Sequence, residues 1–377
     1  MPLGIYIHLP LCKTRCPYCD FYSQTDSNLA QAIIDAILCE IRLSNDTFRS
    51  EENATVYLGG GTPSCFSVPQ IASILMEIQN QLIIDDVLNN ENTIEINPDD
   101  LTIERLHGYF ESGLNRLSLG TQSFNDRELS LLGRRHDSTA NYRAIALIEK
   151  SAIDNFSLDL IFGLPGQTLR DFEFSLKTAL DVHPQHISLY CLTFEKGTDF
   201  YKRRESGKLI ELNSEIQNQM YLRAVELLSG AGFRQYEISN FAIPGRESKH
   251  NLNYWNLGEY IGLGPAAHSH LGNTRSANVP DVHRYIECLS RSELPVDSRE
   301  EISAASRLEE LLMLSLRQPK GLNLADYKNL SGADLPVVRE PLIENLLNKK
   351  LALIEGNYLR LTLHGFLVVD EIISVLL

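Results

Sequence analysis

Three cysteines lie close together near the start of the chain, in a loop that follows an apolar run. The segment 11–20 reads LCKTRCPYCD, so Cys12, Cys16 and Cys19 have the spacing C-x3-C-x2-C. Seven cysteines placed at random along the chain would produce this spacing with a probability of about 0.002. Thiolates are soft metal ligands, so the loop is a candidate site for an iron–sulfur cluster or for zinc.

Three chemistries remain open for this loop. A structural zinc site takes four protein ligands, and His8 on the preceding apolar run is the nearest fourth candidate. A [4Fe–4S] cluster held by three cysteines leaves one iron open to an exogenous ligand. Unligated thiols are the third alternative. An open iron is chemically useful in a way that a closed zinc site is not, so the cluster is the favoured interpretation.

The remaining cysteines are scattered along the chain. At such isolated positions a cysteine usually behaves as a small buried hydrophobic side chain, and in a reducing compartment disulfides are not expected. This expectation applies to Cys39, Cys65, Cys191 and Cys288.

The elements around the cysteine loop alternate between strand-like runs and helical periodicity up to about residue 193. The predicted strands span residues 4–9, 55–58, 93–97, 116–120, 156–162 and 186–192. Apolar residues recur at helical spacing between them, and glycine and proline follow several of the strands. Six such repeats predict an α/β fold with parallel strands and outer helices, in a partial (β/α)6 barrel. Ligands of such sheets bind at the carboxyl ends of the strands, so chemistry is expected in the loops that follow them.

The alternation ends near residue 200, which suggests three regions. Residues 1–200 form the predicted partial barrel, residues 201–295 a mixed α+β extension, and residues 296–377 a small C-terminal helical domain. In this last region, residues 352–354 and 358–363 flank Gly356-Asn357 and predict a β-hairpin like that of a winged helix. Residues 300–377 hold 8 basic and 11 acidic side chains, so packing is favoured over DNA binding.

Composition narrows the function classes. The 377 residues carry 34 Lys+Arg and 49 Asp+Glu, a net charge of −15, which disfavours general binding to nucleic acid or to anionic membranes. No apolar run approaches the ~18–20 residues that a membrane-spanning helix needs. The N-terminal segment lacks the features of a signal peptide, so a cytoplasmic location is expected.

Further motifs follow the predicted strands in order. They are YIHLP at residues 6–10, GGGTP at 59–63, EINP at 95–98 and DLIFGLP at 159–165. With the cysteine spacing directly after the first strand, the set resembles the radical S-adenosylmethionine (radical SAM) superfamily. Within it, the chain is similar to the group of the oxygen-independent coproporphyrinogen III oxidase, HemN. The resemblance covers nearly the whole chain.

This resemblance implies two cofactors. Cys12, Cys16 and Cys19 would hold a [4Fe–4S] cluster, whose open iron would be chelated by the amine and carboxylate of S-adenosylmethionine. In the family, an electron from the cluster cleaves the sulfonium to give a 5′-deoxyadenosyl radical. The residues that would surround S-adenosylmethionine are Tyr6, Tyr18, Gly60, Gly61, Thr62, Glu95, Gln122, Arg134 and Asp159. Without the motifs, the charged members of this set would read as ordinary surface ion pairs.

This chain differs from the oxidase in three features of its sequence. The oxidase carries a further cysteine two positions after the third, where this chain has Phe21, and the chain reaches its first strand without the oxidase's N-terminal arm. The third departure is the segment H-N-x-x-Y-W with His250, Tyr254 and Trp255. Together these features resemble the haem chaperone family HemW.

The H-N-x-x-Y-W segment also has chemistry suited to a porphyrin. Neutral imidazole is a common axial ligand of haem iron, and aromatic rings offer flat apolar area with polar atoms at the edge. The plain alternative is a capped turn with two core aromatics. His268 and His270 are weaker candidates for the iron ligand or for the border of the S-adenosylmethionine pocket.

The working hypothesis is a cytoplasmic haem chaperone, whose cofactors are a [4Fe–4S] cluster, S-adenosylmethionine and haem. Its expected partners are haem, an unidentified haem-accepting protein and an electron donor for the cluster, with no nucleic acid and no transmembrane segment. Whether it is an enzyme stays open, because the alternative is the oxidative decarboxylation of coproporphyrinogen III. A third alternative is a zinc-stabilised scaffold.

Overall fold

A parallel sheet forms the first half of the protein. The computed structural model describes residues 2–48, 53–82 and 90–377. The six strands pair in chain order, each parallel to the next. They are β1 (Leu3–Leu9), β2 (Ala54–Gly60), β3 (Asn92–Ile96), β4 (Arg116–Gln122), β5 (Phe156–Phe162) and β6 (His186–Cys191). The predicted α/β fold is confirmed, and each predicted strand coincides with an observed one to within two residues at either end.

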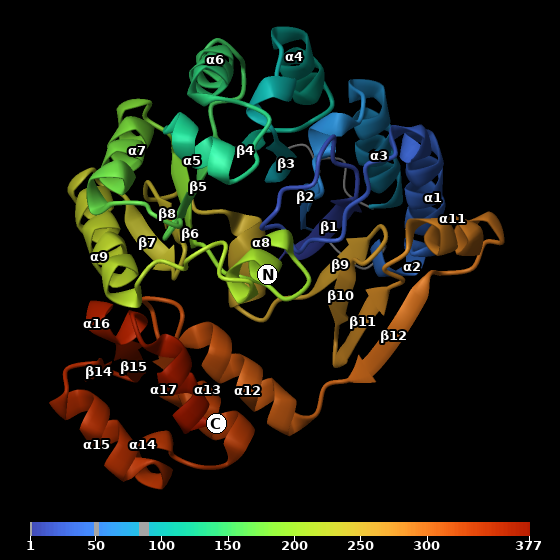
Figure 1. Ribbon diagram of the computed structural model, residues 1–377. Coiled ribbons are helices and arrows are strands. Elements are labelled where there is room, and N and C mark those ends of the chain that lie inside the picture. The colour runs from blue at the N-terminus through green and yellow to red at the C-terminus, as the bar shows by residue number, and fades with distance from the viewer. Residues whose placement is uncertain (1, 49–52, 83–89) are drawn as a thin grey trace.

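Helices cover the outer face of this sheet, as the curved arrangement in Figure 1 shows. The longer ones are α1 (Ala30–Leu43), α3 (Val68–Gln81), α4 (Ile103–Glu111), α6 (Ser138–Ile148), α7 (Leu169–Asp181) and α9 (Ser214–Gly230). The shorter ones are α2 (Asn45–Phe48), α5 (Asp126–Leu131) and α8 (Asp199–Glu205). Two of the longer helices begin with a capping box, at Ser67 and at Thr168, which satisfies backbone N–H groups in their first turn.

Alternating residues of each strand explain the two faces of the sheet. In β1 the apolar residues Ile5 and Ile7 are fully buried and belong to the same hydrophobic core as Ile33 of α1 and Ile71 of α3. The residues between them, such as Tyr6, point to the opposite face because side chains alternate along a strand. The main core therefore lies between sheet and helices, and the inner face of the sheet is free to carry polar side chains.

The region after residue 230 extends this sheet at both edges. Its strands are β7 (Arg234–Glu237), β8 (Asn240–Ala242), β9 (Tyr260–Leu263), β10 (His268–Leu271), β11 (Thr274–Asn278) and β12 (Val296–Glu301), with helices α10 (Lys249–Trp255) and α11 (Val282–Ser290). In the described part of the chain the sheet has twelve strands, in the order β12-β11-β10-β9-β1-β2-β3-β4-β5-β6-β8-β7. β7 and β8 form an antiparallel pair, because the chain turns back at residues 238–239.

A small C-terminal unit follows, drawn in orange and red below the barrel in Figure 1. Its elements are α12 (Ala304–Ser315), β13 (Leu322–Asn323), α13 (Leu324–Ser331), α14 (Leu335–Val338), α15 (Glu340–Asn348), β14 (Ala352–Glu355), β15 (Tyr358–Leu361), α16 (Leu363–Phe366) and α17 (Val369–Leu376). The hairpin β14–β15 lies where the Gly356-Asn357 turn predicts it, and β13 adds a third strand. The predicted division at residue 296 stays a prediction; β12, which begins there, pairs with β11 of the large sheet.

Membrane-spanning helices and the burial of the scattered cysteines are two features for which the sequence leads to an expectation. No helix in the ranges 2–48, 53–82 and 90–377 combines the length and apolar character that crossing a bilayer requires. The expectation that the scattered cysteines are buried is wrong. Cys39, Cys65 and Cys288 are partly exposed, and Cys191 is exposed because β6 ends there at the open end of the barrel.

Candidate functional site

A cavity of about 380 Å³ lies at the carboxyl ends of the parallel strands. It is lined by residues from the ends of all six strands β1–β6 or from the loops that follow them. This is the position at which open parallel sheets bind ligands. The predicted site residues that line it are Cys12, Cys16, Cys19, Tyr18, Gly60, Gly61, Thr62, Glu95, Gln122, Arg134 and Asp159.

The cysteine loop is fixed at both ends before it reaches the cavity. A parallel bridge pairs Leu11 with Gln24, and the backbone N–H of Cys12 donates to the Gln24 carbonyl at 2.8 Å. Within the loop, the N–H of Cys19 donates to the Cys16 carbonyl at 3.2 Å, which closes a tight turn around Pro17-Tyr18. The loop thus begins and ends at one backbone bridge just beyond β1, and its cysteines line the same cavity.

Hydrogen-bond donors already approach two of the three sulfurs. The Thr62 hydroxyl donates to Cys12 Sγ at 3.4 Å, and Arg134 Nη1 donates to Cys16 Sγ at 3.6 Å. Burial raises the pKa of Cys12, and it raises that of Cys19 to about 11. Such donors and a nearby positive charge favour the anionic form of a sulfur ligand, and they are among the features that tune an iron–sulfur cluster.

The cysteine loop fits a cluster. In the described ranges, no three His, Cys, Asp or Glu side chains converge closely enough to hold one metal ion between them. A [4Fe–4S] cluster makes a different demand, because each of its cysteines bonds to a separate iron atom. Cys12, Cys16 and Cys19 carry free thiols on a single loop that faces one cavity.

The glycine loop after β2 packs against the end of β1. Gly60 has φ of 105°, which favours glycine, and a side chain there would approach the His8 ring to 2.5 Å. A side chain at Gly61 would approach the backbone carbonyl of Leu11 to 2.8 Å. Glycine leaves the backbone open to a ligand, and at these two positions it also allows close packing between the two loops.

Two carboxyl groups line the cavity close enough to influence each other, those of Glu95 and Asp159. Glu95 Oε1 accepts a hydrogen bond from the Tyr57 hydroxyl at 2.9 Å, and Ser118 donates to both oxygens of Asp159 at 3.0 and 3.1 Å. Burial, with the Asp159 carboxyl beside it, raises the pKa of Glu95 to about 7, and burial also raises the pKa of Asp159. A ligand with ammonium and sulfonium charges would relieve this repulsion, so the pair suits a cationic ligand such as S-adenosylmethionine.

Backbone strain directs another polar group into the cavity. Gln122 ends β4 at a φ of 63°, where the register with β5 shifts. Such irregularities change the direction of side chains and occur often beside functional sites.

Arg134 also lines the cavity, close to Gln122. It donates from Nη2 to the Gly120 carbonyl at 3.0 Å and to Asn97, while its buried Nε has no partner among the described residues. The guanidinium therefore keeps a donor available for an anionic group.

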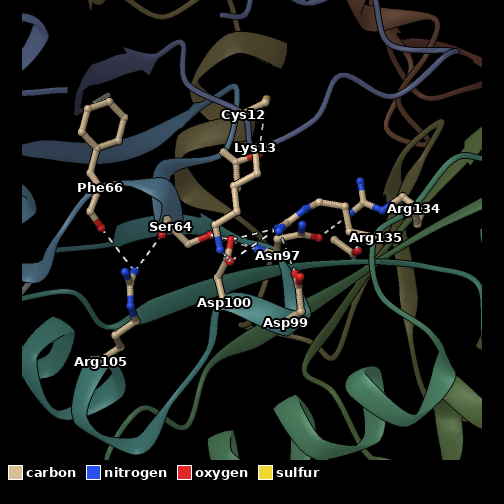
Figure 2. A network of polar contacts seen from close by, with 12 residues as sticks. Cys12, Lys13, Ser64, Phe66, Asn97, Asp99, Asp100, Arg105, Arg134 and Arg135 are labelled. Carbon is tan, nitrogen blue, oxygen red and sulfur yellow. Dashed lines mark hydrogen bonds and ion pairs between the residues drawn. The ribbon is translucent and has the colours of Figure 1, made fainter. Parts of the chain in front are cut away.

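A buried aspartate joins the loops around the cavity, as Figure 2 shows. Asp100 receives an ion pair from Lys13, next to Cys12, a hydrogen bond from Ser64 at 3.0 Å, and an ion pair from Arg135 at 3.4 Å. Lys13 comes from the cysteine loop, Ser64 from the loop after β2, and Arg135 from the segment between α5 and α6. This carboxylate thus holds together three segments that each contribute lining residues.

Four predicted residues lie outside the set that lines the cavity in the described part of the chain: Tyr6, His250, Tyr254 and Trp255. The Tyr6 hydroxyl forms a hydrogen bond with His8 Nδ1 at 3.1 Å. His250 is 1% exposed, with Nδ1 bonded to the Thr55 hydroxyl and Nε2 to the Tyr254 hydroxyl, both at 2.9 Å. Burial lowers the pKa of His250 to about 3, so the ring is neutral. A neutral ring suits an iron ligand, but both of its nitrogens are already engaged.

The weaker histidine candidates lie on β10, where the His270 ring contacts Tyr260, which in turn contacts Tyr254 of α10. His268 is exposed, and His270 is buried with Nε2 at 3.2 Å from Arg307 Nη1.

Trp255 is half-buried, and its carbonyl accepts a hydrogen bond from Gln318 Nε2 at 2.8 Å. The H-N-x-x-Y-W segment therefore connects the barrel to the C-terminal unit.

Several lining or supporting residues were not predicted from the sequence. The cavity is also lined by Tyr57, Ser118, Tyr190 and the exposed Cys191. Asp100 holds together the loops around it. The period of two along each strand was the available signal, because Tyr57 lies two residues before Gly59 and therefore on the same face. No comparable signal marks Asp100, whose role depends on three loops meeting in space.

Comparisons with known proteins agree with this arrangement. Residues 6–179 match the radical SAM superfamily, and residues 302–368 match the HemN C-terminal domain. The chain is 34% identical over 373 residues to the "Heme chaperone HemW" of Bacillus subtilis (strain 168), covering 99% of this chain and 98% of that protein. It is 32% identical over 387 residues to the "Heme chaperone HemW" of Haemophilus influenzae (strain ATCC 51907 / DSM 11121 / KW20 / Rd), covering 100% and 98%.

A solved structure has the same fold. Coproporphyrinogen III oxidase (HemN) from Escherichia coli, described as a radical SAM enzyme, superposes with a TM-score of 0.85 at 19% identity. The match covers 100% of this chain and 90% of that one. The predicted radical SAM barrel with its C-terminal extension is thereby confirmed as the fold. Given the full-length identity to the curated relatives, the chain belongs to the HemW family of the radical SAM superfamily.

Proposed function

We propose that this protein is a haem chaperone that binds haem and transfers it to an acceptor haemoprotein, in the cytoplasm. The observation that carries the proposal is the similarity to proteins named heme chaperones along essentially the whole chain, at 32–34% identity. The haem acceptor and the electron donor of the cluster are the partners that this function requires.

The cavity is the proposed site of the cluster and of S-adenosylmethionine. Cys12, Cys16 and Cys19 would ligate three irons, and a bound cluster supplies one-electron reduction. Glu95 and Asp159 would hold the cationic and hydroxyl groups of S-adenosylmethionine, and the guanidinium of Arg134 would attract its carboxylate. Tyr18, Gln122 and the loop 60–62 would complete the pocket.

For haem, we propose the segment with His250, Tyr254 and Trp255. The neutral imidazole of His250 has the chemistry of an axial ligand, and the two larger rings offer apolar area with polar edges. In the structure His250 Nε2 is bonded to Tyr254, so iron ligation by this nitrogen requires that hydrogen bond to break. Tyr6, bonded to His8 beside the cysteine loop, is proposed to support the cluster end of the pocket.

The alternative function, oxidative decarboxylation of coproporphyrinogen III, shares the fold but differs at Phe21. This side chain is 64% exposed and lines the cavity at the position where the oxidase has a cysteine. A phenyl ring can neither ligate metal nor exchange a hydrogen atom as a thiol does. We therefore propose no decarboxylation.

The test uses anaerobically purified full-length protein, in which iron, sulfide and zinc are counted. Haemin titration followed by Soret absorbance measures haem binding, and coproporphyrinogen III turnover is assayed with reductant and S-adenosylmethionine present. Stoichiometric haem binding without vinyl product is the expected result. Multiple turnovers to vinyl product would establish the oxidase instead, and zinc in place of iron would establish the scaffold.

A further inference from the structure

The carboxyl group of Glu95 depends on a neighbouring side chain that also lines the cavity, Tyr57. Tyr57 donates to Glu95 Oε1 at 2.9 Å, and the Gly60 N–H donates to Oε2 at 3.3 Å. A side chain at Gly59 would meet both Tyr57 and Glu95 at 3.0–3.1 Å, so the pair is closely packed. The orientation of the Glu95 carboxyl toward the cavity is therefore set in part by where the Tyr57 ring lies.

The Tyr57 ring is held in turn by His250. The two rings stack with centroids 5.2 Å apart and planes 24° from parallel. His250 Nδ1 is bonded to Thr55, which lies two residues before Tyr57 and so on the same face of β2. His250 thus stacks on the Tyr57 ring while its two ring nitrogens are held by Thr55 of β2 and by Tyr254.

The start of α10 is attached to the same part of the sheet. The buried carboxylate of Glu91, just before β3, accepts hydrogen bonds from the Ser248 hydroxyl at 3.0 Å and from the N–H groups of Lys249 at 2.9 Å and His250 at 3.0 Å. Four residues later, β3 carries Glu95. These hydrogen bonds therefore fix the position of the segment that carries His250 relative to the strand that carries Glu95.

We propose that His250 is a positioning residue of the S-adenosylmethionine pocket, which acts by stacking on Tyr57 and so fixing the hydrogen bond from Tyr57 to Glu95. The inference rests on the proposed assignment of the cavity to S-adenosylmethionine. It gives the H-N-x-x-Y-W segment a second role beside haem binding, and it joins the two sites through three side chains in contact.

This contact predicts a coupling between the two ligands. If His250 exchanges its bond to Tyr254 for another partner, the surface on which Tyr57 rests changes, and the affinity for S-adenosylmethionine changes with it. Thermodynamic linkage then requires S-adenosylmethionine to change the affinity for haem by the same factor. A cycle of four binding measurements, each ligand with and without the other, gives this factor directly.

The experiment titrates S-adenosylmethionine onto the reduced, iron-loaded full-length protein and follows the magnetic resonance spectrum of the cluster. Tyr57→Phe keeps the ring but removes the hydroxyl, and His250→Ala removes the stacking surface. Each is expected to raise the dissociation constant about tenfold, the effect of losing one hydrogen bond to a charged group. The double variant should be no weaker than the weaker single variant, because both act on the same bond. His250→Phe should restore part of the affinity by replacing the ring.

Tyr236→Phe is the matched control. Tyr236 donates or accepts a hydrogen bond with His186 Nε2 at 2.8 Å, and the two rings lie 5.6 Å apart. This pair is a second buried tyrosine–histidine contact, and neither member belongs to the set that lines the cavity in the described chain. The variant should bind S-adenosylmethionine as the wild type does. Iron content and the thermal midpoint of every variant are measured alongside.

The outcomes separate this inference from the proposed function. If the wild-type cluster responds to S-adenosylmethionine while Tyr57→Phe and His250→Ala bind it with unchanged dissociation constants, the inference is overturned and the function stands. An equal loss in Tyr236→Phe also overturns it, since the effect would then be general destabilisation. If the wild-type cluster does not respond at all, the assignment of the cavity is wrong and the inference falls with it. Should His250→Ala fail to fold, His250→Leu, which fills the space but offers no ring to Tyr57, takes its place and is expected to show the same loss.

Discussion

At the carboxyl ends of β1–β6 the predicted ligand residues face an open cavity, whereas on α10 the predicted haem residues bond to one another and to β2. Arg134 keeps an unpartnered Nε within the described chain, and Glu95 and Asp159 repel each other there. His250, in contrast, has both ring nitrogens satisfied. The two regions both carry predicted ligand residues, but the polar groups of the cavity are free to bind a ligand and those of α10 are already bonded.

This difference has an energetic meaning. A site whose polar groups already face a cavity gains its full interaction energy when the ligand arrives. At α10, a ligand that takes His250 Nε2 must first replace a hydrogen bond, which costs about 0.5–1.5 kcal/mol net. If haem takes this nitrogen, as we propose, its apparent affinity is reduced accordingly, which would suit a carrier that must release what it binds.

The sharpest test of the contrast removes a thiol from the cavity. Cys16→Ala is expected to abolish the cluster, because two cysteines cannot retain the cubane, and the spectral response to S-adenosylmethionine should vanish with it. Haem binding at α10 should persist. Iron counting and haemin titration on the same preparation check both statements, with Cys288→Ala as the control that keeps full iron content. Loss of haem binding together with the cluster would show that the two regions are one site.

A charge removed from the cavity should have the next largest effect. Asp159→Asn keeps the shape of the side chain but removes its charge, so the affinity for S-adenosylmethionine should fall about 10- to 100-fold. Iron content should be unchanged, because Asp159 lies on β5 and not on the cysteine loop. Binding is measured from the spectrum of the reduced cluster. A wild-type dissociation constant in this variant would exclude Asp159 from the pocket.

On α10, His250→Ala is expected to lower haem affinity by about tenfold, or ~1.4 kcal/mol, and to change the Soret spectrum. The cluster should stay intact, since His250 would bind a different iron. Trp255→Phe retains a flat ring and should change haem affinity much less. Difference spectra during haemin titration provide the measurement. Equal effects of the two substitutions would argue that α10 contributes apolar surface alone.

The smallest expected effect is a dependence on pH at the cavity. Because burial raises the pKa of Glu95 to about 7, the carboxyl is largely protonated at pH 6 and largely ionised at pH 8. A cationic ligand favours the ionised form, so affinity for S-adenosylmethionine should rise several-fold from pH 6 to pH 8. Glu95→Gln should remove that part of the rise; an unchanged profile would assign it to other groups, such as Asp159 or the ligand's own amine.

The barrel could be predicted from the sequence because its determinants are local. Each strand is an apolar run of suitable length. The motifs follow the carboxyl ends of the strands, which the parallel topology brings to one edge of the sheet. The cysteine spacing lies within eight residues, so no tertiary information was needed to identify that loop as a candidate metal site.

The support behind the cavity could not be predicted, because it depends on contacts between distant residues. Tyr57 and His250 are about half of the chain apart in sequence, and their stacking requires β9 to pair with β1 so that α10 lies beside β2. Asp100 likewise gains its role from three loops that converge in space. The burial of Cys191 was misjudged for a similar reason, since its exposure follows from where β6 ends.

The backbone hydrogen bonds that close the cysteine loop affect how a cluster would be inserted. In zinc fingers the metal itself holds the chain together, so binding and folding are one event. Here the isolated Leu11–Gln24 bridge, just beyond the end of β1, closes the loop by backbone hydrogen bonds, and the entropy of loop closure is already offset by the fold. The iron-free protein is therefore expected to be folded and competent to accept a cluster afterwards. Maturation would then be a loading step on a finished scaffold, reversible by chelation without unfolding.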